Sequence, residues 1–248
     1  MDFAIPVGRL FGIPIRLHVV FLLLFAVLVV QTYATAGGEL ATQFAMQFSL
    51  VFLFVLLHEL GHSVVAQSFG IHVLDITLWP LGGLARLSTT PQSSRVEFAV
   101  AIAGPAVNFA LAAACLPLAR ALPPLADWLD FAFWTNCVMG GFNLIPAFPL
   151  DGGRVFRAAI ARELSWLAAT RVAVRVARGL AIVLFLAGIA APEAFGLVLI
   201  AVFVFVSAGS ELRVAEAREY DRLARAFDAF ATFGHVEGPR PPRPSRGP

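Results

Sequence analysis

The chain has 248 residues, of which 59% are hydrophobic and 14% charged, and its mean hydropathy is +0.81. This composition excludes a water-soluble globular protein of this length and indicates an integral membrane protein. The formal net charge is only +2, and we expect no nucleic-acid partner. Cys115 and Cys137 both lie in apolar stretches without CxxC spacing, which argues against a disulfide or a cysteine-ligated metal.

Six apolar runs predict transmembrane helices, because they can cross much of the roughly 30 Å hydrocarbon layer of a bilayer. They cover residues 17–36, 41–69, 96–118, 128–150, 180–190 and 194–210. The fifth run is short, so its helix is expected to begin earlier, near Val172. Arginines gather before the first run, between the second and third, after the fourth and after the sixth. The positive-inside rule therefore predicts that both termini face the cytoplasm.

Two further segments, residues 7–18 and 72–89, mix β-branched and aromatic residues with Gly and Pro turn signals, and each is predicted to form a pair of strands. An open sheet edge cannot face lipid, so these strands belong at the membrane interface or along a protein-walled cavity. The predicted fold class is an α-helical integral membrane protein with about six transmembrane helices and a small interfacial or re-entrant β-sheet. Residues 1–210 would form this membrane domain, 211–232 an amphipathic cytoplasmic helix, and 233–248 a disordered tail rich in Pro and Arg.

The second apolar run contains the sequence HELGH, which places His58, Glu59 and His62 in an otherwise apolar helix. On a helix the two imidazoles lie one turn apart on one face, as two ligands of a tetrahedral zinc ion require. The glutamate between them can take a proton from a zinc-bound water. Because ionisable residues inside a membrane are costly, they mark functional sites. The motif predicts a zinc site with Glu59 as catalytic base; the alternative is a set of polar residues that only bond neighbouring helices.

A catalytic zinc takes three protein ligands, so one more ligand must come from another span. Asp151 is favoured, because Pro146 and Pro149 break the fourth run just before it, near the cytoplasmic face. Asp75 is a rival, but on its predicted strand it is expected to meet Arg86 or water. The alternative for Asp151 is an ordinary helix cap.

Three motifs in this order carry a family resemblance: HELGH, then GPAVN at residues 104–108, then NLIPAFPLDGG at residues 143–153. Together they resemble the site-2 protease family of intramembrane zinc metalloproteases, over about residues 7–210. Many members of that family carry a PDZ domain or a CBS pair. This chain resembles the compact six-span subgroup that lacks both.

The resemblance implies hydrolysis of a peptide bond within or near the bilayer, in a membrane-anchored protein substrate. It implies one Zn²⁺ per chain, held by His58, His62 and Asp151, with Glu59 as the base. It also suggests an anti-sigma factor or a similar regulator as the substrate. The expected location is a prokaryotic cell membrane, with the active site towards the cytoplasm.

Four residues beside these motifs are candidates for supporting roles. Gly82 and Gly83 can present an edge strand to an unwound substrate, although a plain hairpin turn explains them as well. Asn143, near the break in the fourth run, is a candidate for binding the substrate backbone. Asn108 is a candidate either for supporting a metal ligand or for linking helices.

Two other classes of function stay open on the sequence. One is a membrane transporter or metal carrier that uses the same His and Asp residues, since such residues also mark ion pathways. The other is a catalytically inactive scaffold that binds membrane proteins. The intact set of His58, Glu59, His62 and Asp151 favours the protease over both.

Overall fold

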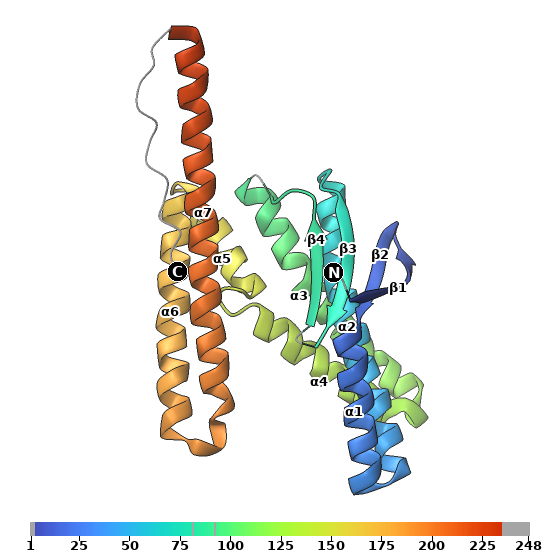
Figure 1. Cartoon of the computed structure of the whole chain (residues 1–248). Coiled ribbons are helices and arrows are strands. Elements are labelled where there is room, and N and C mark those ends of the chain that lie inside the picture. Colours follow the sequence, from blue (N-terminus) through green and yellow to red (C-terminus); the bar gives the residue numbers. More distant parts are fainter. Residues whose placement is uncertain (1–2, 81, 92, 235–248) are drawn as a thin grey trace. The chain divides into compact units, whose positions relative to one another are not determined.

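The computed structural model describes residues 3–80, 82–91 and 93–234, and it is mostly helical (Figure 1). The chain divides into two compact units, residues 1–144 and 145–248. In the first unit the helices are α1 (Val19–Ala36), α2 (Gly38–Ser68), α3 (Ser94–Ala121), the short 3₁₀ helix η1 (Pro123–Leu125) and α4 (Ala126–Asn143). In the second they are α5 (Asp151–Ile160), α6 (Trp166–Ala190), the 3₁₀ helix η2 (Pro192–Ala194) and α7 (Gly196–Gly234).

Five helices of the described chain are long and apolar enough to cross a membrane: α1, α2, α3, α6 and α7. The expected class, a helical membrane protein with a small sheet, is confirmed. The fourth apolar run forms α4, which is not among these five and carries Asp127 and Asp130 near its start. It ends at Asn143 rather than at residue 150, because Pro146 and Pro149 cannot continue a helix. The helix expected over 211–232 is instead the uninterrupted continuation of α7, and residues 235–248 of the expected tail lie outside the described residues.

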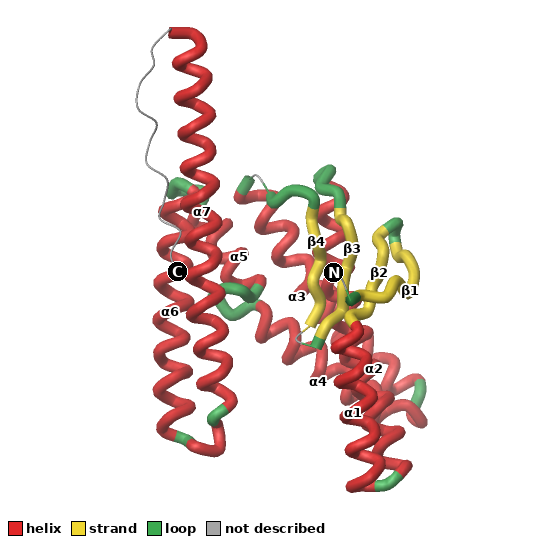
Figure 2. The backbone as a smooth tube through the Cα atoms, viewed as in Figure 1, coloured by secondary structure: helices red, strands yellow, loops and turns green. Residues whose placement is uncertain are grey.

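The two strand segments form one four-stranded sheet in the order β1 (Ala4–Leu10), β2 (Ile13–His18), β3 (Val73–Trp79), β4 (Gly82–Leu87) (Figure 2). β1–β2 and β3–β4 are antiparallel hairpins, as expected, and β2 pairs with β3 in parallel. A parallel pair needs a long crossover, and here α1 and α2 supply it. The sheet is therefore tied to the start of α1 and to the end of α2.

Branched apolar side chains fasten the sheet to α2 and α3. Ile13 and Ile76 are fully buried and pack with Leu60 of α2 and Val100 of α3 in one core cluster. Burying each such side chain contributes about 1.5–3 kcal/mol. This core fixes β3 and β4 beside the half of α2 that contains the HELGH sequence.

A partly buried ion pair links three of the strands. Asp75 of β3 accepts hydrogen bonds from the guanidinium of Arg86 on β4, including one of 2.9 Å from its Nε, and Arg16 of β2 lies 3.7 Å away. The hydrogen bonds from Arg86 hold the pKa of Asp75 below its usual 3.8, against the opposing effect of burial. Asp75 thus pairs with Arg86, as expected from the sequence. Its carboxylate is engaged within the sheet, which argues against Asp75 as a metal ligand.

The second unit is built around the antiparallel pair α6 and α7, and α7 runs on well beyond α6 (Figure 1). Small residues let the two helices approach closely, as is common between membrane helices. The buried core of this unit contains Ala147, Phe148, Ala173, Val174, Ala177, Ala181, Val204 and Ala208. The segment before α5 is therefore anchored in its own unit through Ala147 and Phe148.

Candidate metal site

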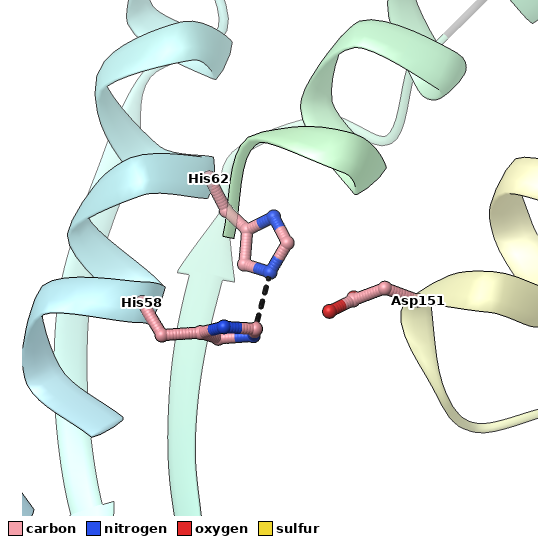
Figure 3. A group of neighbouring side chains, drawn as sticks. All are labelled: His58, His62 and Asp151. Atoms are coloured by element: carbon pink, nitrogen blue, oxygen red, sulfur yellow. Dashed lines mark hydrogen bonds between the residues drawn. The ribbon is translucent and has the colours of Figure 1, made fainter. Parts of the chain in front are cut away.

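His58 and His62 lie one turn apart on α2, with their rings edge to face and their centroids 4.7 Å apart. Their Nε2 atoms face each other at 3.1 Å, the pair joined by the dashed line in Figure 3. Two imidazole ligands of one tetrahedral zinc place their nitrogens about 3.3 Å apart, given Zn–N distances of about 2.0–2.1 Å. The geometry of the pair therefore suits two ligands of a single ion.

A relay of side-chain amides fixes the hydrogen on His58. Asn136 of α4 donates from Nδ2 to the carbonyl of Ala132 at 2.9 Å, and its Oδ1 accepts from Nδ2 of Asn108 at 2.8 Å. Asn108 of α3 then presents Oδ1 to Nδ1 of His58 at 2.6 Å. Because a peptide carbonyl can only accept, it sets the direction of every bond in the relay. Nδ1 of His58 must therefore carry the hydrogen, and its Nε2 keeps a lone pair.

The tautomer of His62 is fixed in the same way by the backbone of α3. Its Nδ1 lies 2.7 Å from the carbonyl oxygen of Val100, which only accepts, so Nδ1 carries the hydrogen. The amide nitrogen of Gly104 is also 3.3 Å from this atom, but the shorter contact with an obligatory acceptor decides the assignment. In the neutral rings two lone pairs then face each other, an arrangement that needs a cation between them. The donor set fits a zinc ion, for which a carbonyl or amide behind each histidine is the usual support.

Gly104 lets α3 pass directly against both imidazoles. A Cβ at this position would overlap the ring of His62 and lie 2.8 Å from Cε1 of His58. Only a glycine leaves room for the two rings and for the backbone that orients them. The GPAVN sequence therefore supplies both Gly104 and the amide of Asn108 to the histidine pair.

Glu59 is half-buried on α2, and the backbone of β4 lies against it. A Cβ on Gly83 would overlap Cγ of Glu59 and lie 3.2 Å from its Oε1. Gly82 is the first residue of β4, pairs with Trp79 across the hairpin and has a φ of +135°, which favours glycine. The structure thus places Gly83, rather than Gly82, against the expected catalytic base.

The remaining expected residues lie at the two ends of the segment between α4 and α5. Asn143 is the last residue of α4 and donates from Nδ2 to the carbonyl of Met139, one turn earlier, at 3.0 Å. Asp151 is the first residue of α5 (Figure 3), where a carboxylate also benefits from the helix dipole. Gly153 brings this first turn close to the preceding segment, because a Cβ there would lie 2.7 Å from the backbone nitrogen of Phe148.

Sequence reasoning missed Asn136, the carbonyl of Val100 and the steric role of Gly104. Asn136 carried a usable signal, since it is a polar residue inside an apolar run. The other two carry none, because a carbonyl and an absent side chain gain their roles only when α2 and α3 pack together.

Comparison with known proteins gives a consistent result over most of the chain. The model of peptidase family M50 matches residues 46–125 and 122–184. A zinc metalloprotease of Methanocaldococcus jannaschii is 34% identical over 92% of this chain, and the putative zinc metalloprotease Rip3 of Mycobacterium tuberculosis is 33% identical over 94%. The chain spans about two thirds of these relatives, 66% and 65% of their lengths.

The solved structure of the site-2 protease from Methanocaldococcus jannaschii is also similar. It superimposes with a TM-score of 0.61 at 33% sequence identity, covering 85% of this chain and 95% of that one. The match of the fold and the match of the family model agree with one another. The chain therefore belongs to peptidase family M50, the site-2 protease family.

Proposed function

We propose that this protein is a zinc-dependent intramembrane endopeptidase that cleaves a membrane-anchored protein within or near its transmembrane segment. The observation that carries the proposal is the pair of Nε2 lone pairs of His58 and His62, 3.1 Å apart on an apolar helix with Glu59 between them. The membership of family M50 and the names of the relatives support the same reaction.

In this proposal Zn²⁺ is held by His58, His62 and Asp151, each of which offers one ligand atom. Asp151 is argued from the donor set, since catalytic zinc sites take three protein ligands and often combine two histidines with one carboxylate. Asp75, the rival ligand, already accepts a hydrogen bond from Arg86 within the sheet, at 2.9 Å. When bound, the ion supplies a Lewis acid that brings the pKa of a water near neutrality.

The protein's own groups carry the protons. Glu59 accepts a proton from the attacking water and returns it to the leaving amide nitrogen, as general base and then general acid. Asn108 and the carbonyl of Val100 keep Nδ1 of the two histidines protonated, so that both Nε2 lone pairs stay available.

A transmembrane substrate must unwind first, because a helix keeps its peptide groups in hydrogen bonds. β4 is the last strand of its sheet, and its outer edge can pair with an extended segment by main-chain hydrogen bonds. Gly83 brings this strand against Glu59, which would set the scissile bond beside the base. Asn143 is a second candidate for holding the substrate backbone, once its amide leaves the carbonyl of Met139.

The positive-inside pattern of arginines supports a topology with both termini and the site towards the cytoplasm. An anti-sigma factor or a comparable regulator in a prokaryotic cell membrane is the substrate we propose to look for first.

Changing Glu59 to Gln tests the reaction. Glu59→Gln should bind zinc as the wild type does and lose cleavage by at least about 100-fold, because the proton acceptor is gone. Membrane proteomes of cells that express the two forms would reveal the fragments that depend on Glu59. Glu39→Gln, the same change at an exposed position of the same helix, is the matched control and should remain active.

An active Glu59→Gln enzyme would overturn the assignment of the base, and metal flux across vesicles with no cleavage would favour a carrier instead. Asp151→Asn tests the third ligand separately, by its zinc affinity. Unchanged affinity in that variant would remove Asp151 from the ligand set while leaving Glu59 in its role.

A further inference from the structure

Two arginines on the facing helices α6 and α7 approach one another in the second unit. Arg154, Arg157 and Arg171 of this unit pair with Glu211 or Glu216. Arg178 and Arg213 differ: within the described residues no carboxylate oxygen lies within the 4.0 Å that defines an ion pair.

Gly209 of α7 is the meeting point of these two side chains. A Cβ built on Gly209 would lie 3.2 Å from Nη2 of Arg178 and 3.8 Å from Nη1 of Arg213. The guanidinium of Arg178 also stacks on Phe205, with Cζ 4.9 Å from the ring centroid. Phe205, Gly209 and Arg213 are four residues apart and so share one face of α7. Two cations thus converge over one glycine.

This arrangement calls for an anion. Arg213 is exposed and donates from Nη2 to Oγ of Ser210 at 3.0 Å. Like charges held close together repel, and within the described residues neither guanidinium has a carboxylate at ion-pair distance to offset the other. Nε of Arg178 is buried without a hydrogen-bond partner in the described structure, and the residue as a whole is half-buried. Any counter-charge for Arg178 must therefore be met at its Nη atoms, beside those of Arg213.

The depth of the pair indicates where the anion comes from. From the turn between α6 and α7, the apolar part of the hairpin extends about 20 Å along the helices before it reaches Arg178 and Gly209. The hydrocarbon layer is about 30 Å thick, so the pair lies short of the far membrane surface. Arginine side chains extend towards that surface, and headgroups are drawn in to meet them.

We propose that Arg178 and Arg213 form, over Gly209, a binding site for the phosphate of an anionic phospholipid. Guanidinium groups bind phosphate oxygens in a bidentate manner, and basic pockets between membrane helices are known recognition sites for anionic headgroups. Arg175, one turn before Arg178 and exposed, adds a third positive charge that disfavours a zwitterionic lipid. The site is separate from the histidine pair and stands whether or not the chain is a protease.

Native mass spectrometry of the full chain in detergent, titrated with phosphatidylglycerol and in parallel with phosphatidylcholine, tests the proposal. The wild type should retain one phosphatidylglycerol and bind phosphatidylcholine far more weakly. The double variant Arg178→Gln/Arg213→Gln should lose at least about tenfold in affinity for phosphatidylglycerol. Arg218→Gln/Arg225→Gln, which removes the same charge from exposed positions of α7, is the matched control and should bind as the wild type does.

Equal binding of the two lipids, or wild-type affinity in the Arg178/Arg213 variant, would overturn the site. Displacement of the lipid by excess inorganic phosphate would show a site for free phosphate and overturn the lipid assignment. If the double variant fails to fold, the phosphatidylglycerol affinity of the single variants Arg178→Lys and Arg213→Lys is measured instead. These keep the charge but lose the bidentate geometry, so each should weaken binding, and wild-type affinity in both would contradict the proposal.

Discussion

His58 owes its protonation pattern to two residues that lie on other helices. Asn108 and Asn136 each use an acceptor on one side and a donor on the other, so the relay transmits the polarity of one peptide carbonyl to the imidazole. Both asparagines are fully buried, and an amide that turned over there would leave two acceptors or two donors in contact. The tautomer of His58 therefore depends on how the two amide groups are oriented, as well as on the presence of asparagine at both positions.

Asn136 is a positioning residue, and Asn136→Leu should lower zinc affinity about 10–100-fold. Leucine removes the amide oxygen to which Nδ2 of Asn108 donates and leaves only the weak acceptor Sδ of Met139, at 3.4 Å. Asn108 can then turn its amide nitrogen towards His58 and favour the wrong tautomer. Competitive zinc titration measures the loss, and nitrogen chemical shifts of the imidazole report the tautomer, which a purely packing defect would not change. Asn136→Asp should restore the tautomer, because its buried carboxyl, in the protonated form, can donate to the carbonyl of Ala132 and still accept from Asn108. Gln43→Leu at an exposed position is the control.

Gly104→Ala should reduce bound zinc and destabilise the protein by about 1–3 kcal/mol, because the added methyl group overlaps the imidazole of His62. Metal analysis of the purified protein and its thermal unfolding give the two readouts. Gly141→Ala is a matched control, since a Cβ there meets nothing within 4 Å and alanine favours a helix by up to about 1 kcal/mol. Full zinc occupancy in Gly104→Ala would show that α3 can move away from the histidines without cost.

The β3–β4 hairpin brings β4 to Glu59, and at the scale of elements its stability depends on Asp75. The hydrogen bonds from Arg86 lower the pKa of Asp75 in the folded state below its unfolded value. The ionised carboxylate therefore stabilises the hairpin above the unfolded pKa, and this stability is lost as the pH falls through the folded pKa. The hairpin should open in acid before the helices do.

Asp75→Asn should remove this acid sensitivity. The protection of the β3 and β4 amides against hydrogen exchange, relative to their intrinsic rates, is followed from about pH 6 down to about pH 2. It should fall in the wild type and stay flat in the variant. At neutral pH the variant should lose on the order of 1–2 kcal/mol of local stability, a modest value because the Arg86 side chain is 44% exposed. The same pH profile in both proteins would show that the pair does not govern the hairpin.

The elements differ in how far the sequence predicts them. The histidine pair, the two hairpins and the break after Asn143 follow from local rules, namely helical spacing, β-branched runs and proline. The parallel pairing of β2 with β3 does not, because it joins segments separated by two membrane helices. Nor does the link between Asn108 and Asn136, since the facing sides of α3 and α4 are set by packing.

For the whole molecule, the number of membrane crossings decides which surfaces share a compartment. Five of the described helices have the length and hydropathy of a membrane span, and α4, which follows α3 in the chain, is the candidate for a sixth span. An even number of crossings keeps both ends of the chain on one side, as the arginine pattern requires. The apolar runs predicted the helices well, but α4, which has 18 residues like α1, is more polar and carries two aspartates near its start.

Single cysteines placed in a variant with Cys115 and Cys137 changed to serine test this count in intact cells. If α4 crosses, Arg9→Cys and Glu163→Cys should be labelled from the same side, and Glu39→Cys from the other. All three positions are exposed, so a membrane-impermeant reagent reaches them from their own compartment. Labelling of positions 9 and 163 from opposite sides would mean that α4 lies within one leaflet.

α7 passes without interruption from its apolar first half into a polar second half that ends at Gly234. A helix of this kind is stiff, and at 1.5 Å per residue the part beyond Glu216 is a lever of roughly 27 Å. No hinge separates this lever from the face that packs on Ala173 and Ala177 of α6. A force or torque applied at the distal end is therefore delivered mechanically to the second unit inside the membrane.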